Sequence, residues 1–134
     1  MIVGLGIDAV GVARVARLLA RHPERLFAHC FSTDEVRRPG DVQHVAGLLA
    51  AKEAAFKALG TGWGEGVGWR QVVVERLANG QPSLRLEGAA ARRAAELGTG
   101  HSHLSITHDG GLAIAVVILE TRAASGEDAT IAIP

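Results

Sequence analysis

Apolar and polar positions follow two different periods in the first third of the chain. The apolar residues at positions 2–7, interspersed with glycines, indicate a buried first strand. Positions 12–21 instead have the period of a helix with one apolar face and one basic face. Residues 22–44 follow neither period, so we expect an irregular segment, in which Ser32 and Glu35 could cap a short helix.

The longest helical pattern covers residues 45–59 and consists almost entirely of apolar residues. Lys52 falls inside the apolar sector, whereas Glu53 and Lys57 lie side by side at its edge. One interpretation is structural, with Glu53 and Lys57 as a surface ion pair and Lys52 extending its ammonium group out of the core. The other is that these charges meet a ligand, and the pattern alone leaves both open.

Glycines end this helix and recur at every second position from Gly60 to Gly68. Gly60 and Gly62 would let the backbone approach a ligand closely, although the lysine and hydroxyl residue of a P-loop are missing. A flexible connector is the alternative.

Short strands dominate the second half of the chain. Asn-Gly at 79–80 and Asp-Gly-Gly at 109–111 indicate turns, and the latter precedes a continuous apolar run typical of a central strand. The expected elements are strands at 69–76, 82–87, 103–108 and 112–119 and a helix at 88–98. Strands and helices mix without strict alternation, which predicts an α+β domain.

Composition narrows the class of protein. A length of 134 residues, 48% of them hydrophobic and 21% charged, suits one soluble globular domain. Basic and acidic side chains balance at 14 each, which argues against a nucleic-acid or membrane-binding protein. We find neither a signal peptide nor a membrane-spanning stretch and expect a cytoplasmic location. The single cysteine, Cys30, permits no internal disulfide and is expected in the core.

Two carboxylates stand in apolar surroundings, Asp8 at the end of the first strand and Glu53 in the long helix. Such groups are costly to desolvate unless positive charge compensates them. Two oxygen ligands, with water and phosphate in the other positions, are the usual way in which a protein holds Mg²⁺. Lys52 and Lys57 would then supply positive charge for phosphate oxygens, so these residues predict a magnesium and phosphate site.

Two further features allow more than one interpretation. The stretch HSHLSITHD at 101–109 superficially suits zinc, but we disfavour that metal because the further ligands and longer chain of zinc hydrolases are absent. Arg14, Arg17 and Arg21 share one helix face, which is either a solvated surface or a docking surface for an acidic partner.

Three motifs in this order, GLGIDAVGVARV, LAAKEAAFKALGTG and HLSITHDGGLAIAVVILE, resemble those of holo-acyl-carrier-protein synthases. These enzymes are the short, single-domain branch of the 4'-phosphopantetheinyl transferase superfamily. The resemblance runs from about residue 2 to 120. It implies one domain at 1–120 with an antiparallel-rich sheet and a long central helix, followed by a tail at 121–134 that we expect to be partly disordered.

The resemblance also implies a reaction. The family moves the phosphopantetheine arm of coenzyme A onto a serine of an apo acyl carrier protein, uses Mg²⁺ and releases 3',5'-ADP. Asp8 and Glu53 match the family's metal ligands, and Lys57 matches a lysine expected to contact the diphosphate. Phosphoryl transfer needs this neutralisation of charge.

Other site residues follow from the same resemblance. His108 and Asp109 match a polar pair near the site, so either of them, or a metal-bound water, could take the serine proton. His103 and Ser105 match positions that contact coenzyme A. Arg14 matches a position that docks the acidic carrier, which favours the docking interpretation of its helix face.

Members of this branch typically form homotrimers with sites at subunit interfaces, and we expect the same here. The chain departs from many relatives at Leu48, where they carry arginine, and at Gln81, where they carry lysine. Two other functions remain open, a magnesium-dependent coenzyme A or nucleotide hydrolase and a non-catalytic carrier-binding protein.

Overall fold

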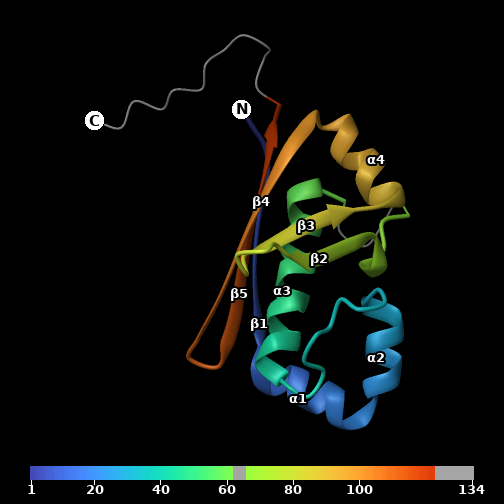
Figure 1. The fold of residues 1–134 in the computed structure, drawn as a ribbon, viewed down its shortest axis with the longest axis vertical. Helices are drawn as coiled ribbons and strands as arrows, with labels where there is room; N and C mark the ends of the chain where they lie inside the picture. Colours follow the sequence, from blue (N-terminus) through green and yellow to red (C-terminus); the bar gives the residue numbers. More distant parts are fainter. Residues whose placement is uncertain (62–65, 123–134) are drawn as a thin grey trace.

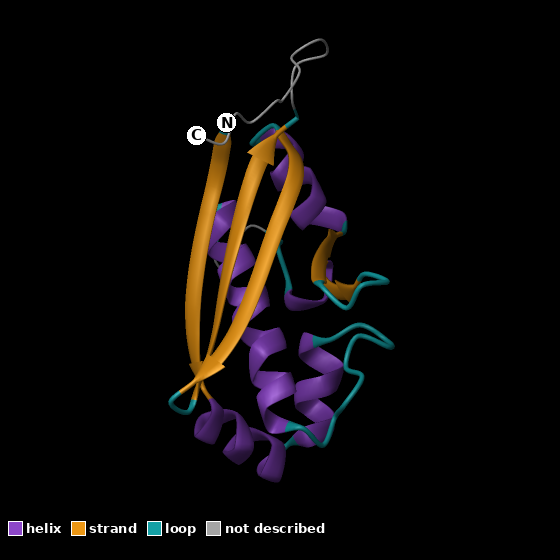
Figure 2. Ribbon diagram, turned by 60° about the vertical axis from the view of Figure 1, so that its left-hand side comes forward, coloured by secondary structure: helices purple, strands orange, loops and turns teal. Residues whose placement is uncertain are grey.

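The computed structural model describes residues 1–61 and 66–122, which form an α+β fold around one long helix (Figure 1). The elements are β1 (Ile2–Gly11), α1 (Val12–Arg21), α2 (Pro23–Cys30), α3 (Val42–Leu59), the 3₁₀ turn η1 (Trp69–Gln71), β2 (Val72–Arg76), β3 (Pro82–Leu86), α4 (Gly88–Glu96), β4 (Thr99–Asp109) and β5 (Leu112–Thr121). An antiparallel sheet has the order β1-β5-β4, and a β2-β3 ladder packs against α3 and β4. Figure 2 shows the helices gathered on one face of the larger sheet.

Helix α3 forms the centre of the core. It is buried on nearly all sides, which explains why its sequence is apolar on nearly all sides. The Asp41 carboxylate accepts a hydrogen bond from the His44 backbone N–H at 3.2 Å, and Gly60, with φ 74°, ends the helix in the left-handed conformation. The predicted helix and its glycine stop are confirmed, although the helix begins at Val42 rather than at 45.

Strand β1 is placed as predicted, but its apolar side chains are not buried. Gly4 and Gly6 face α3, whereas Leu5 and Ile7 are 62% and 60% exposed. A Cβ atom at Gly6 would lie 1.8 Å from the Ala54 carbonyl oxygen, so the glycines let the helix approach the strand closely. The prediction of a buried strand was therefore wrong about which face of β1 the core covers.

Segment 22–44 contains a helix, α2, that the prediction of an irregular segment missed. Pro23 stands in the first turn of α2, where its fixed φ and missing N–H favour a helix start. The short helix expected after Ser32 does not form. Glu35 Oε1 does accept a hydrogen bond from the Ser32 backbone N–H at 3.1 Å, but residues 33–35 make only a turn.

The remaining predicted strands and the helix at 88–98 are present, but residues 69–71, expected in a strand, form the 3₁₀ turn η1, and β4 begins at Thr99 rather than at 103. Strand β5 pairs with both β1 and β4 and is the central strand of its sheet. Thr121, expected in the tail, still belongs to β5, and the tail from residue 123 lies outside the described residues. Among residues 1–61 and 66–122, no helix is both long and apolar enough to span a bilayer.

Candidate active site

Asp8 on β1 faces the C-terminal half of α3 and is held there by Lys57. The Lys57 ammonium group donates hydrogen bonds to Asp8 Oδ1 and to the Ile7 carbonyl oxygen, both at 3.0 Å. Asp8 Oδ2 is buried and has no hydrogen-bond partner within the described part of the chain. A buried carboxylate oxygen without a partner is costly, so this side of Asp8 favours an additional cation or donor.

Glu53 lies one turn before Lys57 on α3 and close to the same carboxylate. Burial, followed by the Asp8 carboxyl group, raises the pKa of Glu53 to about 7, while Arg14 and Lys57 act in the opposite direction. Burial and the neighbouring Asp8 carboxyl group therefore both disfavour the ionised form of Glu53.

This pair fits a magnesium ion. Mg²⁺ binds carboxylate oxygens and usually keeps several positions for water and substrate phosphates, so two protein carboxylates suffice. Asp8 offers its unpaired Oδ2 and Glu53 offers a carboxyl group whose ionisation a cation would favour. In the described ranges no group of three or more histidine, cysteine or acidic side chains is arranged around a metal position.

A cavity of about 190 Å³ opens beside Glu53. Arg14 from α1 and Trp69 from η1 contribute to its lining, and Leu18 connects it to a more apolar cavity of about 370 Å³ between α1 and α2. Arg17 and Arg21 are exposed on α1 but line neither cavity. The structure therefore brings only Arg14 of the three predicted docking arginines close to the carboxylates.

Lys52 does not face this site. Its side chain is 0% exposed, and its ammonium group pairs with Glu35 Oε1 at 2.9 Å. It also donates to the carbonyl oxygens of Trp69 and Val72 and lies 5.1 Å from the centre of the Phe31 ring. Because the three ammonium hydrogens are all engaged, the prediction that Lys52 binds phosphate was wrong, and so was the alternative that it extends into solvent.

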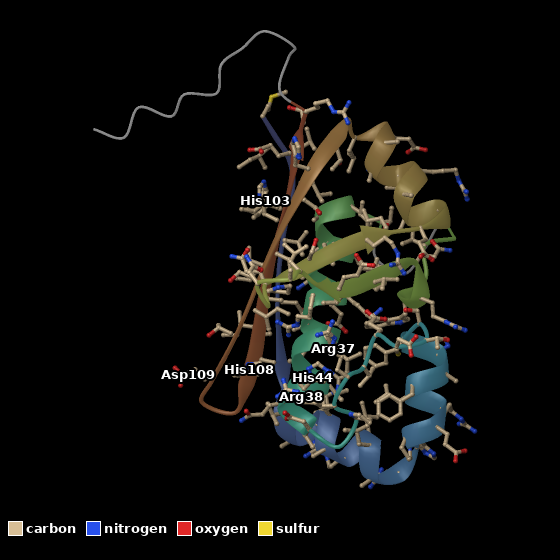
Figure 3. All side chains as sticks on the ribbon, viewed as in Figure 1. Arg37, Arg38, His44, His103, His108 and Asp109 are labelled. Atoms are coloured by element: carbon tan, nitrogen blue, oxygen red, sulfur yellow. The ribbon has the colours of Figure 1, made fainter. Side chains whose placement is uncertain are left out.

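His103, Ser105, His108 and Asp109 lie along β4, with β5 between them and Asp8. In Figure 3 His103 is far from His108, and Asp109 stands at the β4-β5 turn. His108 Nε2 is 2.8 Å from the Gln43 carbonyl oxygen, so Nε2 carries the proton and Nδ1 is the nitrogen left to accept one.

These β4 residues line a different hollow from the carboxylates. His103, Ser105 and His108 line a groove of about 550 Å³ between β4 and the β2-β3 ladder, and His103 also contacts Glu120 at 3.4 Å. Within one chain the predicted site residues thus form two groups, one at the β1 edge of α3 and one at the β4 edge. Gly60 ends α3, and a Cβ atom there would lie 3.6 Å from the Arg93 guanidinium group; Gly62 lies outside the described residues.

Sequence reasoning missed two features. Glu35 is the buried partner of Lys52, and an acidic residue was needed somewhere to neutralise a lysine in the core. Three arginines also lie near enough to His44 to affect its charge. Two of them, Arg37 and Arg38, are adjacent in the sequence and could have indicated a basic cluster, whereas Arg76 is distant in the chain.

A carboxylate pair with a lysine beside a cavity is the kind of site that handles phosphate groups with a divalent cation. Comparison with known proteins agrees. A family model described as the 4'-phosphopantetheinyl transferase superfamily matches residues 4–117. The holo-[acyl-carrier-protein] synthase of Anaeromyxobacter dehalogenans is 50% identical over 127 residues, covering 90% of this chain and 97% of that protein. That of Desulfovibrio desulfuricans is 44% identical over 122 residues, covering 90% and 98%.

Solved structures give the same result. The holo-[acyl-carrier-protein] synthase from Neisseria meningitidis superposes with a TM-score of 0.80 at 28% identity, covering 90% of this chain and all of that one (100%). The Helicobacter pylori enzyme, in complex with coenzyme A, gives 0.78 at 28% identity, covering 87% and 99%. This chain belongs to the 4'-phosphopantetheinyl transferase superfamily.

Proposed function

We propose that this chain transfers 4'-phosphopantetheine from coenzyme A to a serine of an apo acyl carrier protein and releases 3',5'-ADP, as a holo-[acyl-carrier-protein] synthase does. One observation carries the proposal. In a chain of this superfamily, the Asp8 and Glu53 carboxylates form a pair, and the Lys57 ammonium group donates a hydrogen bond to Asp8. Relatives crystallised with coenzyme A support the choice of donor.

In this reaction the serine oxygen bonds to the phosphorus that carries the pantetheine arm. The bond from that phosphorus to the bridging oxygen breaks, its electron pair leaves with 3',5'-ADP, and the serine proton goes to a base. Lys57 would neutralise charge on the departing nucleotide, and the exposure of its side chain beside Asp8 supports this role. Asp8 and Glu53 would hold Mg²⁺, which supplies Lewis-acid stabilisation of phosphate charge when it is bound. His108 and Asp109 stay predictions for the base.

Intact-mass spectrometry of an apo acyl carrier protein, incubated with this protein, coenzyme A and Mg²⁺, tests the proposal. We expect one phosphopantetheine to be added, and none with a chelator or with a carrier whose acceptor serine is alanine. Glu53→Gln should lower the rate about a hundredfold or more, and Arg92→Ala on the exposed face of α4 should not. Consumption of coenzyme A without modified carrier would instead identify a hydrolase, and no consumption with retained carrier binding would identify a binding protein.

The exposed arginines of α1 support an acidic carrier as partner. Arg14 lines the cavity beside Glu53, and Arg17 and Arg21 extend the basic surface along the helix. Reversing Arg14 and Arg17 to glutamate should raise KM for the carrier, and added salt should weaken carrier binding to the unmodified protein. A hydrolase would keep its turnover in the same variant.

The exposed face of β1 supports self-association into a homotrimer. Ile2, Leu5 and Ile7 are each more than half exposed on the same strand, and a group of exposed apolar side chains is typical of an interaction surface. Light scattering after size exclusion should give three times the mass of the chain, and Leu5→Glu should reduce it. A cytoplasmic location stays a prediction.

A further inference from the structure

The buried ion pair of Lys52 and Glu35 joins helix α3 to three other segments of the chain. Both side chains are 0% exposed, and the Lys52 ammonium group lies 2.9 Å from Glu35 Oε1. The same ammonium group donates to the carbonyl oxygens of Trp69 in η1, at 3.0 Å, and of Val72 in β2. Its three hydrogens therefore connect α3 to the turn at 33–35, to η1 and to the start of β2.

The Glu35 carboxylate extends these connections. Its Oε1 also accepts the Ser32 backbone N–H at 3.1 Å, and its Oε2 accepts the Val74 backbone N–H at 2.7 Å. The Lys52 ammonium group lies 5.1 Å from the centre of the Phe31 ring, directly after α2. Because desolvation offsets much of the attraction between buried ions, a pair with this many partners points to a role in fixing geometry. We call Lys52 and Glu35 the Lys52 junction.

Trp69 connects the Lys52 junction to the cavity of about 190 Å³ beside Glu53. Its backbone carbonyl oxygen accepts from Lys52, while Trp69 also lines the cavity together with Arg14 and Glu53. The indole packs edge-to-face on Phe56 of α3, with the ring centres 5.2 Å apart. Trp69 is therefore held on α3 at two points, one on its backbone and one on its ring.

A second wall of the same cavity is tied to the Lys52 junction. Leu26, His29 and Cys30 of α2 line this cavity, and the next residue, Phe31, faces the Lys52 ammonium group. Helix α2 also contacts η1. Within the described residues, the charged side chains of the junction do not line the cavity themselves. Any effect of the junction on the cavity therefore acts through the residues that it holds.

We propose that the Lys52 junction holds Trp69 in place as a wall of the cavity beside Glu53, which makes Lys52 and Glu35 positioning residues for the transfer reaction. The inference rests on the proposed function, which supplies the reaction. Small displacements of a group that positions substrate lower a rate strongly. Because Arg14 lines the same cavity and belongs to the proposed carrier surface, the junction acts on the reaction with the carrier more than on coenzyme A.

A comparison of stability with activity tests the junction. In the double variant Lys52→Met with Glu35→Gln no buried ion is left unpaired, but the donor to the Trp69 carbonyl oxygen is gone. We expect kcat/KM for the carrier to fall about tenfold and KM for coenzyme A to stay within about twofold. Arg92→Met, exposed on α4, is the surface control and should change neither. A folded double variant that modifies the carrier at the unmodified rate would overturn the proposal.

A double-mutant cycle with Trp69→Ala distinguishes positioning from a general loss of structure. If the junction acts through Trp69, adding its two substitutions to Trp69→Ala should lower kcat/KM by less than about twofold further. Losses that multiply as independent effects would overturn the proposal, because the junction would then act without Trp69.

Fluorescence tests the same position without any transfer. Trp63→Phe leaves Trp69 as the only tryptophan, since the chain has two. In that background the double variant should shift the Trp69 emission to longer wavelength and make it more sensitive to acrylamide, at a temperature where circular dichroism shows a folded protein. An unchanged emission would overturn the proposal. If the emission changes but the unmodified protein modifies no carrier, the proposed function fails while the hold of the junction on Trp69 stands.

Discussion

At the residue scale, the Lys52 and Glu35 pair makes a prediction about stability. Lys52→Met leaves the Glu35 side chain, itself 0% exposed, without its cation. Loss of one member of a buried ion pair typically costs 3–5 kcal/mol, so we expect the free energy of unfolding to fall by about 3 kcal/mol or more. Urea denaturation measures this change. Arg92→Met is the control, because Arg92 is exposed on α4 and its removal should cost less than about 1 kcal/mol.

The double variant Lys52→Met with Glu35→Gln separates the charge from the packing. It removes both ions and should recover part of the stability that Lys52→Met loses. A Lys52→Met variant as stable as the unmodified protein would contradict the structural role of Lys52.

The sequence showed that Lys52 lies in the apolar sector of its helix. The sequence could not show which group pairs with the Lys52 ammonium group, because Glu35 belongs to segment 22–44, which has no hydrophobic periodicity.

His44 makes a prediction about acid stability. Burial, then Arg38 and Arg76, lower the pKa of the His44 ring, with Arg37 acting in the same direction and Asp41 opposing them. The unfolded chain takes up this proton near the ordinary histidine pKa of about 6.5, and the folded chain only at lower pH. Between those values the unfolded state binds more protons, so stability falls as pH falls below about 6.5.

Urea midpoints between pH 7.5 and 5, measured without phosphate, check this. His44→Gln should show a smaller loss of stability over the same range. An identical pH dependence in His44→Gln would assign the acid sensitivity to other groups.

At the element scale, the contact between β1 and α3 depends on glycine. A Cβ atom at Gly6 would lie 1.8 Å from the Ala54 carbonyl oxygen and 2.8 Å from the Ala58 nitrogen, and backbone atoms cannot move aside as a side chain does. Gly6→Ala should therefore lower the free energy of unfolding by about 3 kcal/mol or more. Thermal unfolding measures the change. Gly68→Ala is the control, because a Cβ there would meet no atom within 4 Å.

Helices and strands with a clear repeat of apolar positions were predictable from the sequence, whereas the contacts between them were not. The apolar pattern of α3 and the glycine after it predicted a buried helix and its end. The pattern of β1 was misread because alternation shows that two faces differ, not which one meets the core. Leu5 and Ile7 suggested the buried face, yet Gly4 and Gly6 occupy it. Helix α2 was missed because its single Pro23 signal is weak without periodicity.

At the scale of the whole molecule, the candidate site is divided. Asp8, Glu53 and Lys57 lie at the β1 edge, and His103, Ser105 and His108 lie on β4, with the central strand β5 between β1 and β4. Two strand spacings alone amount to about 10 Å. The motifs identified both groups of residues by resemblance, but only the fold shows that one chain holds them apart.

Mixing two inactive variants distinguishes a site within one chain from a site shared between copies. Glu53→Gln lacks a metal carboxylate, and His103→Ala with His108→Ala lacks the imidazole groups of the β4 groove. Both variants should be inactive at limiting coenzyme A. If each site combines the carboxylates of one copy with the β4 groove of the next, co-refolding equal amounts should restore about one quarter of the unmodified activity, since a random closed trimer pairs two intact halves at that frequency. Sites contained within one chain would regain nothing. Leu5→Glu, by weakening the exposed β1 face, should abolish the recovery while leaving each chain folded, because Leu5 already faces away from α3.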